Sequence, residues 1–212
     1  MNKYALNKIF VEGEIDKLFI DSLLKKHFNI DDLNLVIATK GKDNLQDSPI
    51  LIDRILKKRE SKNIILFDTD YISKDGGRVK RLKEYSEIGT QLDIKLNVYL
   101  FPNDDETEGE VEDVIKTCFN KDFDIFDNCW SQMLNCFEKN NFEKELNIPA
   151  KEGFLFSKID LFKNYRQNTS WNYSKLTKYD YSDVGIWNLE INENPMLEKL
   201  VNFIKNNLFN NE

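Results

Sequence analysis

Short apolar runs alternate with longer amphipathic segments through the first half of the chain. The apolar runs lie at residues 8–12, 33–39, 63–68 and 94–101, and runs of this length predict buried strands. The segments at residues 15–28, 48–60, 78–89 and 109–119 repeat large apolar residues at helical spacing. This alternation predicts an α/β fold with a Rossmann-like core, in which a mostly parallel four-stranded sheet is flanked by helices.

The second half of the chain has a different pattern. Apolar residues at helical spacing predict helices at residues 124–146, 154–167 and 195–209, whereas the aromatic-rich residues 168–189 fit neither a helix nor a strand. We therefore expect an α/β core over residues 1–120 and a mainly helical C-terminal extension over residues 121–212, packed on the core. The aromatic residues of the extension are also compatible with a homodimer interface.

The composition indicates a protein of the cytoplasm rather than of a membrane. The chain has 212 residues, of which 41% are hydrophobic, yet it contains no apolar run long enough for a transmembrane helix. Its first residues do not form an apolar signal segment. The cysteines, Cys118, Cys129 and Cys136, lack metal-ligand spacing. They suit a reducing compartment, so the expected localisation is cytoplasmic, with no membrane partner.

The histidine content narrows the chemistry that the chain can perform. His27 is the only histidine, and it lies near the end of a predicted helix. Ser-His-Asp triads, Cys-His pairs and multi-histidine zinc sites are therefore hard to build. Any reaction would depend on carboxylates, lysine, arginine, tyrosine or a metal ion.

Carboxylates follow three of the predicted strands. Glu12 follows the first strand, Asp68 and Asp70 follow the third, and the acidic residues 103–113 follow the fourth. Because parallel strands end at one edge of the sheet, where α/β proteins bind ligands, we expect these side chains to meet there. Asp68 and Asp70 are two residues apart and would point to the same side of an extended backbone. Asp16 lies one helical turn after Glu12 and would face the same point.

Carboxylates that lie this close would repel one another and raise one another's pKa values. Divalent cations relieve such repulsion, and hard oxygen ligands suit Mg²⁺ or Mn²⁺. One ion or a pair about 4 Å apart would fit, and the pair is a common arrangement for phosphodiester cleavage. Offsetting the helix dipole is the alternative role for the acids that precede or open helices, which are Glu14, Glu108, Glu110 and Asp113.

Basic residues near the same edge would provide contacts for nucleic-acid phosphates. Lys42 follows the second predicted strand, and Lys74, Arg78 and Arg81 follow the third. A solvated helix face is the alternative explanation for residues 78–83. The net charge of −7 argues against a nucleic-acid partner unless bound cations neutralise some of the acids. Several aromatic residues would either stack on bases or pack internally, namely Trp171, Tyr173, Tyr179 and Tyr181.

Three segments of the chain resemble the Toprim domain of topoisomerases, primases and OLD-type nucleases. They are FVEGEID at residues 10–16, LFDTD at residues 66–70 and LFPNDDETEGEVEDVI at residues 100–115. The Toprim domain has a glutamate after its first strand and an Asp-x-Asp pair after its third. The more specific resemblance is to DUF3226, a family of stand-alone Toprim-like proteins of unknown function. Residues 187–189, which precede the final predicted helix, also resemble this family.

The resemblance implies roles for particular residues. The implied metal ligands are Glu12, Asp16, Asp68, Asp70, Glu110 and Glu112. Glu12 is also the implied catalytic acid or base. Lys158 is the implied catalytic lysine near the scissile phosphate, with Lys163 and Arg166 as alternatives. OLD-type nucleases carry an ATPase on the same chain, and no P-loop motif occurs here.

The expected function is therefore phosphodiester hydrolysis in DNA or RNA by a nuclease that depends on Mg²⁺ or Mn²⁺. A setting in phage defence or DNA repair follows from the resemblance alone. The first alternative is a non-catalytic module that binds metal, nucleotide or nucleic acid. The second is an effector subunit that requires a separate ATPase or defence-system partner.

Overall fold

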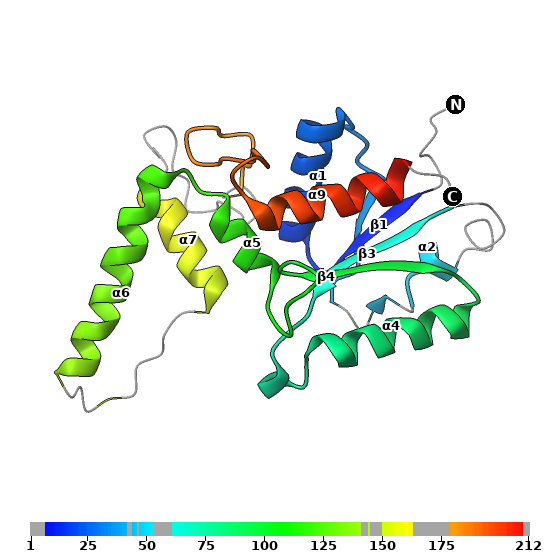
Figure 1. Cartoon of the computed structure of the whole chain (residues 1–212), viewed down its shortest axis with the longest axis horizontal. Helices are drawn as coiled ribbons and strands as arrows, with labels where there is room; N and C mark the ends of the chain where they lie inside the picture. Colours follow the sequence, from blue (N-terminus) through cyan, green and yellow to red (C-terminus); the bar gives the residue numbers. More distant parts are fainter. Residues whose placement is uncertain are drawn as a thin grey trace. The chain divides into compact units, whose positions relative to one another are not determined.

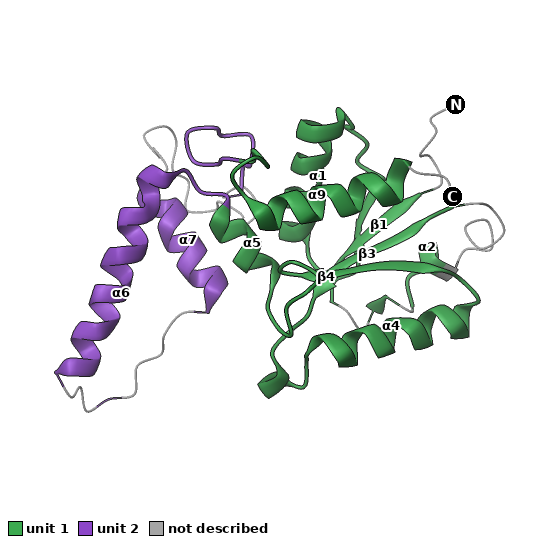
Figure 2. Cartoon of the chain, viewed as in Figure 1, with its two compact units in different colours: residues 1–117, 189–212 green, residues 118–188 purple. Residues whose placement is uncertain are grey.

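The structure is a computed structural model that describes residues 7–41, 44–45, 47–52, 61–140, 144, 150–162 and 179–209. The chain divides into two compact units (Figure 2). The first unit contains residues 1–117 and 189–212, and the second contains residues 118–188.

The first unit is built on a sheet of four parallel strands in the order β2-β1-β3-β4. The strands are β1 (Lys8–Val11), β2 (Val36–Ala38), β3 (Asn63–Asp68) and β4 (Leu96–Phe101). The register pairs Val11 with Leu66 and Asp68 with Phe101. The carboxyl ends of β1 and β3 therefore lie side by side in the middle of the sheet. The predicted α/β fold with a parallel sheet is confirmed.

Helices cover both faces of this sheet. Helix α4 (Arg78–Leu92) lies on one side, and α1 (Glu14–Phe28) and α9 (Pro195–Phe209) lie on the other (Figure 1). Shorter elements complete the unit, namely α2 (Pro49–Ile52), the 3-10 helix η2 (Ile72–Lys74) and α5 (Val111–Thr117). Among the helices in the described part of the chain, none combines the length and the apolar character needed to cross a membrane.

Alternate residues of the strands fill two separate cores. On one face, Phe10, Ile65 and Phe67 form a buried cluster with Tyr85 of α4, whose ring lies 5.7 Å from that of Phe67. Residues of opposite parity in the same strands, such as Ile64, are fully buried as well. Because both faces are covered, the strands read as continuous apolar runs rather than as alternating patterns.

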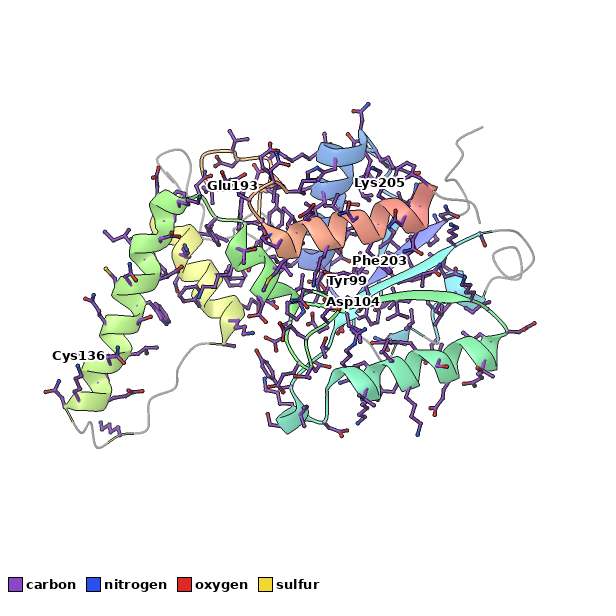
Figure 3. The ribbon with its side chains drawn as sticks, in the orientation of Figure 1. Tyr99, Asp104, Cys136, Glu193, Phe203 and Lys205 are labelled. Atoms are coloured by element: carbon purple, nitrogen blue, oxygen red, sulfur yellow. The ribbon has the colours of Figure 1, made fainter. Side chains whose placement is uncertain are left out.

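The terminal helix α9 packs against β4. Phe203 lies with its ring 5.2 Å from that of Tyr99 on β4 (Figure 3). The buried stripe of the helix consists of Leu197, Leu200, Val201, Ile204 and Leu208. The helix spans the residues predicted for it, and it groups with the sheet rather than with residues 118–188. The stretch expected to form one C-terminal extension thus contributes to both compact units.

The second unit contains the 3-10 helix η3 (Lys121–Phe123), α6 (Asp124–Lys139) and α7 (Lys151–Phe162). Its aromatic residues pack on one another: the ring of Trp187 lies 4.3 Å from that of Phe119 and 4.7 Å from that of Tyr181. The helices predicted at 124–146 and 154–167 overlap α6 and α7, and their predicted C-terminal ends extend into residues outside the described part of the chain.

Candidate metal centre

The ends of β1 and β3 are joined by a hydrogen bond from backbone to side chain. Glu12 directly follows β1, and its Oε1 accepts from the backbone N–H of Asp68, the last residue of β3, at 3.2 Å. Asp16, in the first turn of α1, accepts from the backbone N–H of Gly13 at 2.9 Å. The loop after β1 is thereby shaped by carboxylates, which lie next to the end of β3.

Asp68 links β3 to the segment after β4. Its Oδ1 accepts from the backbone N–H of Val111, the first residue of α5, at 2.8 Å. Burial raises the pKa of Asp68 well above its usual range, and the charges of Glu12, Asp16 and Glu112 raise it further. We call these four residues the acidic cluster: Glu12, Asp16, Asp68 and Glu112. The structure thus places Glu12 and the start of α5 next to Asp68. The role of these acids as metal ligands stays a prediction.

Asp70 makes a different set of contacts. Its backbone leaves the strand with φ +57°, and its N–H donates to the carbonyl of Gly109 at 3.0 Å. Its Oδ2 accepts from Arg81 Nε at 3.1 Å and from Arg81 Nη2 at 2.5 Å. Arg81 is 2% exposed, and its Nη1 donates to Glu84 at 2.6 Å. The sequence prediction that Asp68 and Asp70 point to the same side assumes an extended backbone through both residues. Strand β3 ends at Asp68, and Asp70 has a left-handed conformation instead.

A close approach of glycine backbone fixes the turn that carries Asp70. A Cβ atom added at Gly76 would lie 2.4 Å from Cβ of Asp70 and 2.8 Å from the carbonyl oxygen of Tyr71. The N–H groups of Gly76 and Gly77 donate to the carbonyls of Tyr71 and Thr69, each at 2.9 Å. Only a residue without a side chain fits at Gly76, so this turn requires glycine at that position.

The remaining predicted ligand, Glu110, precedes α5 and is half-buried. Its backbone N–H donates to Oδ2 of Asp113 at 3.0 Å, which organises the entry into the helix. Asp113 therefore accepts a backbone hydrogen bond at the start of α5, where the sequence also allows a role in stabilising the helix.

The predicted phosphate contacts have varied surroundings. Lys74 is exposed, with its ammonium 5.3 Å from the ring centre of Tyr71. Arg78 pairs with Asp104 at 3.0 Å, and Arg81 is held by Asp70 and Glu84. Lys42 lies outside the described residues. Two of the predicted cations are thus engaged by carboxylates of the chain itself.

The predicted catalytic lysine, Lys158, lies in the second unit. It is 1% exposed, and its Nζ lies 3.0 Å and 3.1 Å from the two carboxylate oxygens of Asp127 and 4.5 Å from the ring centre of Phe119. Asp127 and Phe119 belong to the same unit. The catalytic role of Lys158 stays a prediction, and Lys163 and Arg166 lie outside the described residues.

Two of the four aromatic residues considered for base stacking lie in the described part of the chain. Tyr179 and Tyr181 are 3% and 4% exposed and lie with their rings 5.8 Å apart, so internal packing accounts for them. Trp171 and Tyr173 lie outside the described residues.

The donor chemistry of the acidic cluster suits a hard divalent cation, because every side-chain donor is a carboxylate oxygen. Within the described residues, no group of three or more His, Cys, Asp or Glu side chains is arranged as it stands to hold a metal ion. Three of the four cluster carboxylates accept backbone N–H groups. A carboxylate that accepts one such hydrogen bond retains further lone pairs that a metal ion could use.

The role of Arg81 could not be recognised in the sequence. It lies in a basic stretch, residues 78–83, that has the composition of a solvated helix face. Nothing in that stretch distinguishes the buried Arg81 from Lys83, whose side chain is 77% exposed. The helical period offers the only signal, because it places Arg81 and the core residue Tyr85 one turn apart on the same face of α4.

A parallel sheet whose carboxyl edge gathers acids from the ends of β1 and β3 and from α5 defines an α/β protein with an acidic candidate ligand site. The family model described as "Protein of unknown function (DUF3226)" matches residues 6–151, and the chain belongs to this family. The matched region includes the whole sheet and the acidic cluster. Comparisons with curated proteins and with solved structures gave no match.

Proposed function

We propose that the acidic cluster binds Mg²⁺ or Mn²⁺ and that the protein uses this site to hydrolyse phosphodiester bonds of DNA or RNA. One observation carries the proposal: Asp68 is hydrogen-bonded to Glu12 and to the start of α5, and the charges of Glu12, Asp16 and Glu112 raise its pKa. These four acids come from three segments of the chain, at the ends of β1 and β3 and at the start of α5. Such a concentration of like charge is unfavourable unless a proton or a cation offsets it. The resemblance of these segments to the Toprim domain supports the same chemistry.

The position in the fold supports a ligand site. The cluster lies at the carboxyl edge of a parallel sheet, where open α/β sheets bind their ligands. A bound divalent cation would supply electrostatic stabilisation of the phosphate and would lower the pKa of a coordinated water. Asp68, Glu12 and Glu112 would hold the ion, and Asp16 would in addition maintain the turn at Gly13 through its hydrogen bond.

The proposal is tested by incubating supercoiled plasmid DNA, and separately a single-stranded RNA, with the protein and Mg²⁺ or Mn²⁺. We expect nicking or cleavage that chelation abolishes and that Asp68→Asn reduces at least about 100-fold, the range typical for loss of a catalytic electrostatic group. The matched control is Asp75→Asn, since the Asp75 side chain is 88% exposed and lies outside the acidic cluster. Equal rates for the wild-type and Asp68→Asn proteins would refute the hydrolase.

A second candidate function is a module that binds a metal ion and a nucleotide or nucleic acid without cleaving it. It is favoured by the pairing of Arg78 with Asp104 and of Arg81 with Asp70, because these cations are then less available to a scissile phosphate. Calorimetric titration with Mg²⁺ and short oligonucleotides distinguishes the two functions. Tight binding without turnover identifies the module, and turnover identifies the nuclease.

A further inference from the structure

The two aspartates of the Asp68-Thr69-Asp70 segment have different partners. Asp68 accepts from the N–H of Val111 and lies among the other members of the acidic cluster. The carboxylate of Asp70 accepts two N–H groups from Arg81. The two aspartates of the Asp-x-Asp segment thus have different hydrogen-bond partners.

Because Arg81 is buried, moving Asp70 away from it would cost free energy. Its side chain is 2% exposed, and Nε, Nη1 and Nη2 all donate to carboxylates. A buried guanidinium that loses its counter-ion is strongly destabilising, because the charge has neither water nor a partner. Asp70 accepts two of these three hydrogen bonds. Glu84 accepts the third, and its side chain is 37% exposed. If Asp70 moved to a metal ion, Arg81 would keep only its more exposed partner.

The backbone around Asp70 opposes the same movement. The residue has φ +57°, it donates to the carbonyl of Gly109, and the backbone of Gly76 abuts its Cβ atom. Thr69, which precedes it, is fully buried and donates its hydroxyl to the carbonyl of Phe101. The position of Asp70 is therefore held by its neighbours in sequence, by the loop after β4 and by α4.

We propose that Arg81 is a positioning residue that keeps Asp70 as its counter-ion, so that a cation at the acidic cluster is held by Asp68 and not by Asp70. This inference rests on the proposed function for its metal-binding half. The guanidinium supplies the positive charge that Asp70 requires. The acidic cluster then supplies the ligands for a divalent cation without Asp70.

The first test is a double-mutant cycle of Asp70→Asn and Arg81→Met, followed by urea denaturation without divalent ions. Asp70→Asn leaves Arg81 with Glu84 as its carboxylate partner, and Arg81→Met removes the guanidinium from Asp70, so each single variant should lower the urea midpoint. The double variant removes both charges of the pair and should recover part of the loss. Lys83→Met and Asp75→Asn are the matched controls, because both side chains are mainly exposed. Additive losses in the cycle would overturn the pairing of Asp70 with Arg81.

The second test measures binding of Mn²⁺ by electron paramagnetic resonance. The Asp70→Asn, Arg81→Met double variant should bind Mn²⁺ with an affinity within about threefold of the wild type. Asp68→Asn should bind at least about tenfold more weakly. A folded double variant that loses Mn²⁺ as completely as Asp68→Asn would overturn the inference while leaving the proposed metal site intact. If the wild type binds no Mn²⁺, the proposed function fails, and the urea cycle still decides whether Arg81 holds Asp70.

Discussion

At the scale of single residues, Asp68 lies in surroundings that disfavour its charged form. Burial and the charges of Glu12, Asp16 and Glu112 all raise its pKa, and the N–H of Val111 offsets them only in part. Asp70, two residues later, has a guanidinium as its partner. The difference between the two aspartates arises from their surroundings, because the side chains are chemically identical.

We predict that Asp68→Asn stabilises the folded protein at neutral pH when divalent ions are absent. The folded-state pKa of Asp68 is raised, so its contribution to stability is fully present below the unfolded pKa and is lost as the pH rises through the folded value. Asn removes the charge, and its Oδ1 can still accept from Val111. The Asn variant avoids the free-energy cost that a charged Asp68 imposes on the folded protein.

Urea denaturation in chelator over a range of pH measures this effect. The wild-type free energy of unfolding should fall relative to that of Asp68→Asn as the pH rises above the usual range of an aspartate. A variant that is less stable than the wild type at every pH would contradict the repulsion described for Asp68.

His27 gives an independent prediction of pH dependence with the opposite sign. Burial lowers its pKa, with Lys26 adding to the effect, while the hydrogen-bonding contact between Nε2 and the carbonyl of Leu189 at 3.0 Å opposes it. The neutral imidazole is therefore favoured in the folded state. Its contribution to stability is present above the unfolded pKa and is lost as the pH falls through the lower folded value.

Since His27 is the only histidine, one imidazole Hε1 resonance reports its titration in solution. We expect an NMR midpoint below about 6.5, the usual value for histidine. His27→Gln should make the free energy of unfolding less dependent on pH between neutral and mildly acidic conditions. A midpoint above the usual value would show that His27 does not have the half-buried surroundings described.

At the scale of elements, short backbone segments determine where the acids lie. The turn after β3 depends on Gly76, and the segment after β4 depends on Gly109, which has φ +148° and whose added Cβ would lie 2.6 Å from Cδ of Pro102. These two segments meet at the backbone bridge between Asp70 and Gly109. The segments after β3 and β4 therefore form one structural unit, although they are separated by α4.

Gly76→Ala should destabilise the protein by more than about 2 kcal/mol, because its Cβ would overlap backbone and Cβ atoms that cannot move independently. Gly13→Ala is the matched control: its added Cβ would meet Asp16 at 3.6 Å, an ordinary contact, and the cost should be at most about 1 kcal/mol. Thermal or urea unfolding of both variants measures the difference. Similar losses in the two variants would mean that the turn at Gly76 is not as tight as described.

At the scale of the whole molecule, the sequence was sufficient to predict the class of fold. The buried strands are apolar on both faces, so that segments such as residues 63–68 are recognisable without their neighbours. The convergence of Glu12 and Asp68 could also be predicted, because parallel strands end at one edge. The order of the strands could not be read from their apolar patterns, since all of them are similarly buried.

The environment of Asp70 could not be predicted, for a physical reason. Reasoning from strand geometry assumes an extended backbone, whereas Asp70 has the left-handed conformation and a partner on α4. The grouping of α9 with the sheet depends on contacts such as that between Tyr99 and Phe203, which are 104 positions apart by their numbers and leave no local signal. Local patterns identify elements, but contacts between distant segments decide how these elements group.

Calorimetric titration of the wild-type and Asp68→Asn proteins with Mn²⁺ shows whether acids from the ends of β1 and β3 and from α5 form one site for a divalent cation, as we propose. We expect saturable binding to the wild type and binding at least about tenfold weaker to Asp68→Asn, which should remain folded. Binding of equal strength to both proteins, or no binding to the wild type, would contradict the proposal.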